Sequence, residues 1–318
     1  MRLHDGQARQ VVRCVRVAER LRAVVFVLAA TSRVAAAAPA TPLVALAAAD
    51  DARQAVVIGA HGELYEPDGK GAWVHRRPVT TAGALTTAGR AGGAIIASGD
   101  GVVYRLAANG WSAIRLVQHG KAIVGTGTRT LAAVGRQLYA LDPLTTGAPT
   151  KLAVAPANIV ALAAGTKAIV VATDTGVFRL DTARPVGIPT APRRLRLISE
   201  RWAIVDRGAL ELTTGAITAW PGGLTIGAAA TTADGALVAV AATRGGLELV
   251  TLRKAAITRD PLGLSGTAVA VTVDRAGRAL VVLADGRIAL REPTGWTTTQ
   301  VTDEPPAPHP GAPPATSS

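Results

Sequence analysis

The chain has 318 residues and a formal net charge of +12, and 49% of its residues are hydrophobic although only 3% are aromatic. A chain of this length can bury a large core, so a sizeable folded domain is expected. The single cysteine, Cys14, excludes an intramolecular disulfide. Because Cys14 belongs to the N-terminal segment described next, the rest of the chain offers no thiol chemistry.

The first 40 residues follow the order of a secretory signal. Arginines precede the apolar run AVVFVLAA (23–30), and a stretch of small residues with a cleavage pattern at Ala40 comes next. Arg33 interrupts the apolar region, which is too short for a membrane span. We therefore predict a signal peptide over 1–40, cleaved near Ala40, and a periplasmic or extracellular protein. An uncleaved anchor and a cytoplasmic protein are the alternatives.

Much of the positive charge belongs to this N-terminal segment. Seven arginines and two acids lie in residues 1–40, which leaves 27 basic and 20 acidic residues and a net charge of about +7 in the mature chain. A moderate positive charge suits a protein partner or an anionic envelope polymer. Nucleic acid is not expected as a partner, and no membrane span is expected in the mature chain.

A β-rich run, a turn that contains glycine and a second short β-rich run recur seven times along the chain. Equivalent positions lie 39, 35, 39, 33, 37 and 41 residues apart, at Tyr65, Tyr104, Tyr139, Phe178, Glu211, Glu248 and Ala289. A repeat of this length that is made of short strands is typical of a β-propeller. We predict an all-β fold: a seven-bladed β-propeller over 41–302, with four antiparallel strands per blade.

Turn residues divide each repeat into four expected strands. In the second repeat these strands cover 84–89, 94–99, 102–107 and 111–117. In the seventh repeat they cover 267–273, 278–284, 287–292 and 296–301. Because the four strands of every repeat come in order, we expect the ring to close by packing of the seventh blade on the first.

Four of the five tryptophans fall at or within the expected outer strand of a repeat: Trp73, Trp111, Trp220 and Trp296. Packing between blades explains these positions, and an aromatic platform for a ligand is the alternative. The tail over 303–318 contains six prolines and is predicted to be disordered or polyproline-like.

The succession of strand, turn with Asp-Gly, aromatic residue, glycine and tryptophan resembles the broad superfamily of BNR/Asp-box-like and WD-repeat-like propellers. Segment 64–73 looks like a degenerate Asp-box in which Asp68 and Trp73 match in spacing, whereas Pro67 departs from the pattern. The Gly-His and Trp-Asp dipeptides of true WD repeats are absent. The resemblance, over roughly 42–302, implies the propeller fold and carries no function over to this chain.

The sequence predicts no catalytic residue, metal site or cofactor. Acidic residues at the aligned turn after the second strand fall in repeats at least two blades apart, at Asp100, Asp174 and Asp285. A calcium ion needs oxygens at about 2.3–2.6 Å, so these acids are not expected to share one. The histidines show no metal-binding spacing, and no nucleophile elbow or phosphate loop is present.

Basic residues occupy the expected turn between the first and second strands in six repeats, at Arg53, Arg90, Arg129, Lys167, Arg201 and Arg278. Asp234 takes this position in the sixth repeat. Because these turns share one face of a propeller, they predict a basic annulus. Either the annulus binds an anion, or its members are ordinary solvated turn residues.

One expected inner strand, in the fifth repeat, alternates arginine with leucine where the others carry small apolar residues. Arg194 and Arg196 share one face of this strand. They either point to solvent at an irregular blade or form an anion site at the mouth of the central channel.

Together these patterns favour a monomeric, exported binding or scaffold propeller without catalytic activity. The alternative is a propeller hydrolase or lyase that acts on an envelope or extracellular polysaccharide or on a lactone.

Overall fold

The computed structural model describes residues 43–47, 51–68, 72–77, 85, 87–91, 94–99, 102–107, 110–114, 122–125, 130–142, 148–165, 168–180, 186–188, 195–206, 208–222 and 224–302. These residues all belong to one compact unit, Ala38–Ser318. They contain 28 β-strands and, between β1 and β2, a single turn of 3-10 helix, η1, at Ala52–Gln54. The predicted all-β class is confirmed.

The strands follow one another in groups of four that we call quartets, numbered one to seven along the chain. The first quartet is β1 Leu43–Ala47, β2 Val56–Gly59, β3 Leu64–Pro67 and β4 Trp73–Arg77. The second is β5 Thr87–Ala91, β6 Ala94–Gly99, β7 Val102–Ala107 and β8 Gly110–Ile114. The third is β9 Ala122–Gly125, β10 Thr130–Val134, β11 Gln137–Leu141 and β12 Thr150–Val154.

The later quartets repeat this arrangement. The fourth is β13 Ile159–Ala164, β14 Ile169–Thr173, β15 Gly176–Arg179 and β16 Val186–Gly187. The fifth is β17 Leu195–Leu197, β18 Trp202–Val205, β19 Gly208–Glu211 and β20 Ile217–Ala219. The sixth is β21 Thr225–Thr231, β22 Leu237–Thr243, β23 Gly246–Arg253 and β24 Ala256–Pro261. The seventh is β25 Ala268–Val273, β26 Ala279–Leu283, β27 Arg287–Glu292 and β28 Gly295–Thr302.

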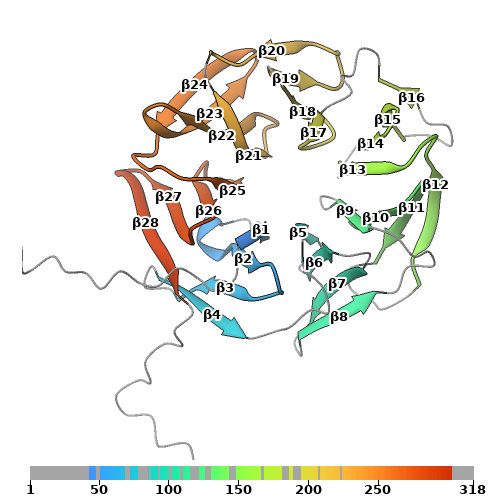
Figure 1. The fold of residues 1–318 in the computed structure, drawn as a ribbon, viewed down its shortest axis with the longest axis horizontal. Coiled ribbons are helices and arrows are strands. Elements are labelled where there is room, and N and C mark those ends of the chain that lie inside the picture. Colours follow the sequence, from blue (N-terminus) through green and yellow to red (C-terminus); the bar gives the residue numbers. More distant parts are fainter. Residues whose placement is uncertain are drawn as a thin grey trace, which may run out of the picture. The chain divides into compact units, whose positions relative to one another are not determined.

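Within each quartet the strands pair antiparallel in chain order. Figure 1 shows the quartets arranged as a ring, with the first strand of each innermost and the fourth at the periphery. The second strands are buried along their whole length in most quartets, as in β6, β10, β14 and β26. Fourth strands such as β12 and β20 are largely exposed. Burial on both faces explains why the second strands are continuous apolar runs without alternation.

The hydrophobic core of the described residues consists of clusters between neighbouring quartets. One cluster, for example, joins Val240 and Leu249 of the sixth quartet to Val281 and Leu283 of the seventh. Another joins Val57 and Tyr65 of the first quartet to the seventh, which closes the ring. The four tryptophans on or directly after the outer strands each contact such a cluster, so the predicted packing between blades is confirmed: Trp73, Trp111, Trp220 and Trp296.

The hydrogen-bonded sheets of the described residues number six rather than seven, because the first and seventh quartets share one sheet of eight strands. Strand β28 pairs with β4 in parallel, with Val301 opposite Trp73 and Thr302 opposite Val74. The expected closure by packing is therefore supplemented by strand pairing. This pair of strands is called the β28–β4 clasp below.

Candidate functional site

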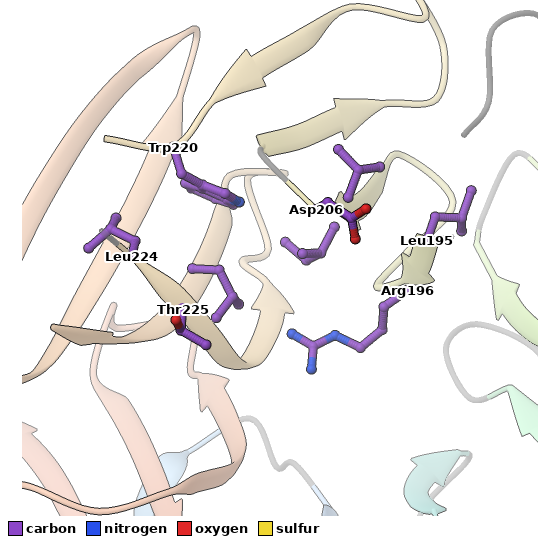
Figure 2. A pocket seen from close by; sticks show the side chains of 9 residues that line it. Leu195, Arg196, Asp206, Trp220, Leu224 and Thr225 are labelled. Atoms are coloured by element: carbon purple, nitrogen blue, oxygen red, sulfur yellow. The ribbon is translucent and has the colours of Figure 1, made fainter. Parts of the chain in front are cut away.

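A cavity of about 520 Å³ lies between the fifth and sixth quartets. Its walls come from β17, the end of β18 and the start of β21, together with the segment that joins the fifth quartet to the sixth. The lining residues are Leu195, Arg196, Ile204, Val205, Asp206, Trp220, Leu224, Thr225 and Ile226 (Figure 2). A volume of this size is typical of sites for small ligands.

Arg196 is placed at this cavity by the alternation of arginine and leucine in β17. Leu195 and Leu197 are half-buried and pack against the core cluster between the fourth and fifth quartets. Arg196 therefore leaves the opposite face of the strand, where it is exposed. The alternation that sets this inner strand apart from the others therefore brings a cation to the cavity. Arg194 lies outside the described residues.

The guanidinium of Arg196 reaches from the fifth quartet to the sixth. Its Nη1 donates a hydrogen bond of 2.6 Å to the carbonyl oxygen of Gly227 in β21. Partial burial of the group lowers the pKa of Arg196 from its usual value, although an arginine stays protonated at physiological pH. This one bond leaves most of the guanidinium donors for a ligand.

An acid and an aromatic side chain also line the cavity. Asp206 follows β18 and is exposed, and Trp220 follows β20 and is half-buried. Figure 2 shows Arg196 extended toward Thr225, with Trp220 and Leu224 on the side of Thr225 and Asp206 nearer to Leu195. The sequence pattern did not single out Asp206. It identified Trp220 only as an outer-strand tryptophan, because nothing in the repeat indicates where two quartets leave a space between them.

The predicted basic annulus is described at three of its turns, and each of these arginines is in an ion pair. Arg53 contacts Glu292 at 2.7 Å, and Arg201 contacts Glu211 at 2.7 Å. Arg201 also lies over the ring of Trp202, 5.3 Å from its centroid. Since carboxylates neutralise much of this charge, the annulus is a weaker anion attractor than the sequence alone suggests.

Arg278, the third of these arginines, belongs to a network that links the first and seventh quartets. It contacts Asp274 at 2.8 Å and Asp51 at 2.7 Å. The side chain of Asp274 is fully buried and also accepts a hydrogen bond of 3.1 Å from the backbone N–H of Ala52. Arg278 therefore has a structural role at the ring closure.

The other three members of the predicted annulus are Arg90, Arg129 and Lys167. Arg90 lies within β5 rather than in the expected turn, because Arg90 pairs with Ile95 and Ala91 with Ala94, which leaves only two residues to connect the strands. The prediction for Arg90 was wrong in this respect. Arg129 and Lys167 lie outside the described residues.

The acidic turn residues were considered as candidates for a metal site. The two that the structure describes lie in hairpin turns. Asp174 lies in the turn between β14 and β15, and Asp285 in the turn between β26 and β27. Asp285 accepts from Arg287 at 2.6 Å. Burial raises the pKa of Asp285, but the hydrogen bonds from Arg287 outweigh this effect and hold the pKa below its usual value. The described residues contain no group of three side chains that could hold a metal ion, and Asp100 lies outside them.

Comparisons with solved structures identify the fold. No family model and no curated protein matches the chain. The WD40 β-propeller domain of Doa1 superposes with a TM-score of 0.59 at 12% identity, over 80% of this chain and 94% of that one. The extracellular domain of a putative one-component system, BT4673 from B. thetaiotaomicron, gives a TM-score of 0.57 at 14% identity, over 80% of this chain and 39% of that one. YCF48 from Cyanidioschyzon merolae gives 0.54 at 16% identity, over 79% and 94%.

The chain has a β-propeller fold. The expected resemblance to WD-repeat-like propellers is confirmed at the level of fold, which is all that such low identities support. Across the described part of the chain, no helix is long and apolar enough to cross a membrane.

Proposed function

We propose that this protein is a binding propeller without catalytic activity, and that its ligand enters the cavity between the fifth and sixth quartets. The observation that carries the proposal is the convergence of Arg196, Asp206 and Trp220 on one space of about 520 Å³. A concave site in which a few polar groups stand among apolar side chains is a usual form of a ligand-binding site.

We further propose that the seven quartets are seven blades. The cores between neighbouring quartets support this count, and they include the one between the seventh and the first. In this interpretation the β28–β4 clasp is an additional link between two complete blades. The propeller then spans 41–302, with a disordered tail over 303–318, and acts as a monomer.

The same proposal places the protein outside the cytoplasm, after removal of residues 1–40. The order of basic, apolar and small residues in this segment supports export, and one solved structure with a similar fold is an extracellular domain. The N-terminus of the protein isolated from its native host is expected near Thr41. An intact 1–40 segment on soluble cytosolic protein would contradict export.

A variant that fills the cavity tests the binding proposal directly. Thr225 is exposed on the cavity wall, so Thr225→Trp should occupy the space at little cost in stability. A panel of anionic polymers and short peptides is titrated into the wild type, Thr225→Trp and Arg253→Gln. Arg253 is a matched surface control in the same quartet, whose side chain is 62% exposed.

We expect every ligand of the wild type to lose at least tenfold in affinity in Thr225→Trp and to bind Arg253→Gln unchanged. If the ligands bind Thr225→Trp as they bind the wild type, the cavity is not the binding site.

A further inference from the structure

The residues that line the cavity restrict its ligand beyond a requirement for negative charge. Six of the nine are apolar, and the polar ones are Arg196, Asp206 and Thr225. The six apolar side chains can cover an apolar part of a ligand, and the charged groups of Arg196 and Asp206 are available for its charged parts.

The two charged residues of the cavity have opposite signs and are not paired with each other. Within the described residues Arg196 donates only to Gly227, and Asp206 has no ion pair. A ligand with only negative charge would be attracted by Arg196 and repelled by Asp206. A ligand that carries one charge of each sign would satisfy both.

The strand register separates these two charges. Arg196 lies opposite Ile204 in the pairing of β17 with β18, and Asp206 is two residues further along. Diagonal neighbours within paired strands are about 7–8 Å apart at their Cα atoms, and Asp206 directly follows the end of β18. Figure 2 shows the Arg196 side chain extended away from Asp206, toward Thr225. This arrangement favours a ligand whose two charges are separated along its length over a free amino acid, whose ammonium and carboxylate share one carbon atom.

A tripeptide has a suitable length, because three extended residues span about 10 Å. Its ends carry opposite charges, and its side chains supply the apolar body. We propose that the cavity binds a short apolar peptide segment with a carboxylate at Arg196 and an ammonium group at Asp206. This inference rests on the proposed function, since it assigns a ligand class to the same cavity. The two charges come either from the ends of a free peptide or from acidic and basic side chains within a longer chain.

The test uses the peptide Leu-Ala-Leu in four forms: with free ends, N-acetylated, C-amidated, and blocked at both ends. A fifth probe, N-acetyl-Lys-Leu-Glu-amide, carries the same two charges on side chains. Isothermal titration calorimetry gives the affinity of each for the wild type, Arg196→Gln, Asp206→Asn and the control Arg253→Gln. Thermal melting of each variant checks that it is folded.

For the wild type we expect blocking of either end to weaken binding roughly tenfold, the effect of losing one charged hydrogen bond. Arg196→Gln should abolish the effect of amidation and keep that of acetylation, and Asp206→Asn should do the reverse. Arg253→Gln should keep both. Tight binding of the fifth probe assigns the charges to a longer chain, and tight binding of the free peptide alone assigns them to peptide ends.

The inference is overturned if the four forms bind within twofold of one another, if both charge effects survive in both variants, or if none of the five probes binds at millimolar concentration. In each of these cases, a polymer that binds the wild type but not Thr225→Trp would still support the proposed binding function.

Discussion

At the scale of single residues, the carboxylate of Asp274 is fully buried at the ring closure and accepts three hydrogen bonds. Its oxygens accept from the backbone N–H groups of Ala52 and Arg278 and from the Arg278 side chain, at 3.1, 2.8 and 2.8 Å. It therefore connects the turn before β26 with η1 in the first quartet. A buried carboxylate with three donors is stabilising only while it stays charged.

Removing this charge should destabilise the fold. We expect Asp274→Asn to lower the free energy of unfolding by about 1–3 kcal/mol at pH 7, because one charged acceptor is lost and a donor is left unsatisfied. Chemical denaturation measures the change. Asp285→Asn is the matched control, since Asp285 is half exposed and pairs locally with Arg287, and it should cost less than about 1 kcal/mol. Equal losses in the two variants would contradict the structural role of Asp274.

The same residue predicts a pH dependence of stability. Burial raises the pKa of Asp274, but the hydrogen bonds from Ala52 and Arg278 outweigh it and hold the pKa below the usual value. A carboxylate with a lowered folded-state pKa contributes its full stabilisation above the unfolded-state pKa of about 3.9 and loses it as the pH falls through the folded-state pKa. Thermal melting from pH 7 to pH 2 should show the difference in Tm between wild type and Asp274→Asn shrinking below about pH 4. A constant difference across this range would refute the linkage.

At the scale of elements, the β28–β4 clasp should contribute measurably to ring closure. Val301 is fully buried in the core between the seventh and first quartets and pairs with Trp73. A chain that ends at residue 299 lacks both the clasp and this side chain. We expect it to lose about 2–4 kcal/mol of unfolding free energy, as for the loss of a large buried side chain.

A chain that ends at residue 303 is the control for this truncation. It keeps β28 and removes only the proline-rich tail, whose composition predicts no part in the core. Its Tm should match that of the full chain. A chain ending at residue 299 that melts with the full chain would show that packing alone closes the ring.

At the scale of the whole molecule, the net positive charge predicts a salt-dependent attraction for anionic polymers. At physiological ionic strength, salt screens interactions between exposed charges that are more than about 8 Å apart. The affinity for polyglutamate should therefore fall steeply as the salt concentration rises. Replacing Arg90, Arg129 and Arg201 with alanine tests the predicted basic annulus, and Arg194→Ala/Arg196→Ala tests Arg196 of the cavity together with Arg194, which the sequence predicts on the same face. We expect both variants to bind more weakly than the wild type while remaining folded.

Titrations of the wild type and both variants with polyglutamate at several salt concentrations measure these affinities. Because Arg201 is in an ion pair with Glu211, its contribution to the annulus should be the smaller part of the effect. If both variants bind as the wild type does, the charge serves neither the annulus nor the cavity.

Much of the fold follows from the sequence by itself. The seven recurrences at Tyr65 and its equivalents predicted an all-β propeller, and the strands expected over 94–99, 102–107 and 287–292 have these limits in the structure. The reason is local: hairpin turns and runs of apolar residues depend on neighbours within about ten positions. The same local pattern placed Arg196 on an inner strand and four tryptophans on or directly after outer strands.

Only the tertiary structure decided which of these residues come together. The pairing of β28 with β4, the burial of Asp274 and the approach of Arg196 to Gly227 join positions far apart in the chain. It also decided that Arg53, Arg201 and Arg278 are paired with carboxylates and that Asp206 and Trp220 line one cavity with Arg196. The repeat determines the strands of each blade. Contacts between blades depend on how the side chains of two different repeats fill the space between them, and the repeat pattern does not specify this.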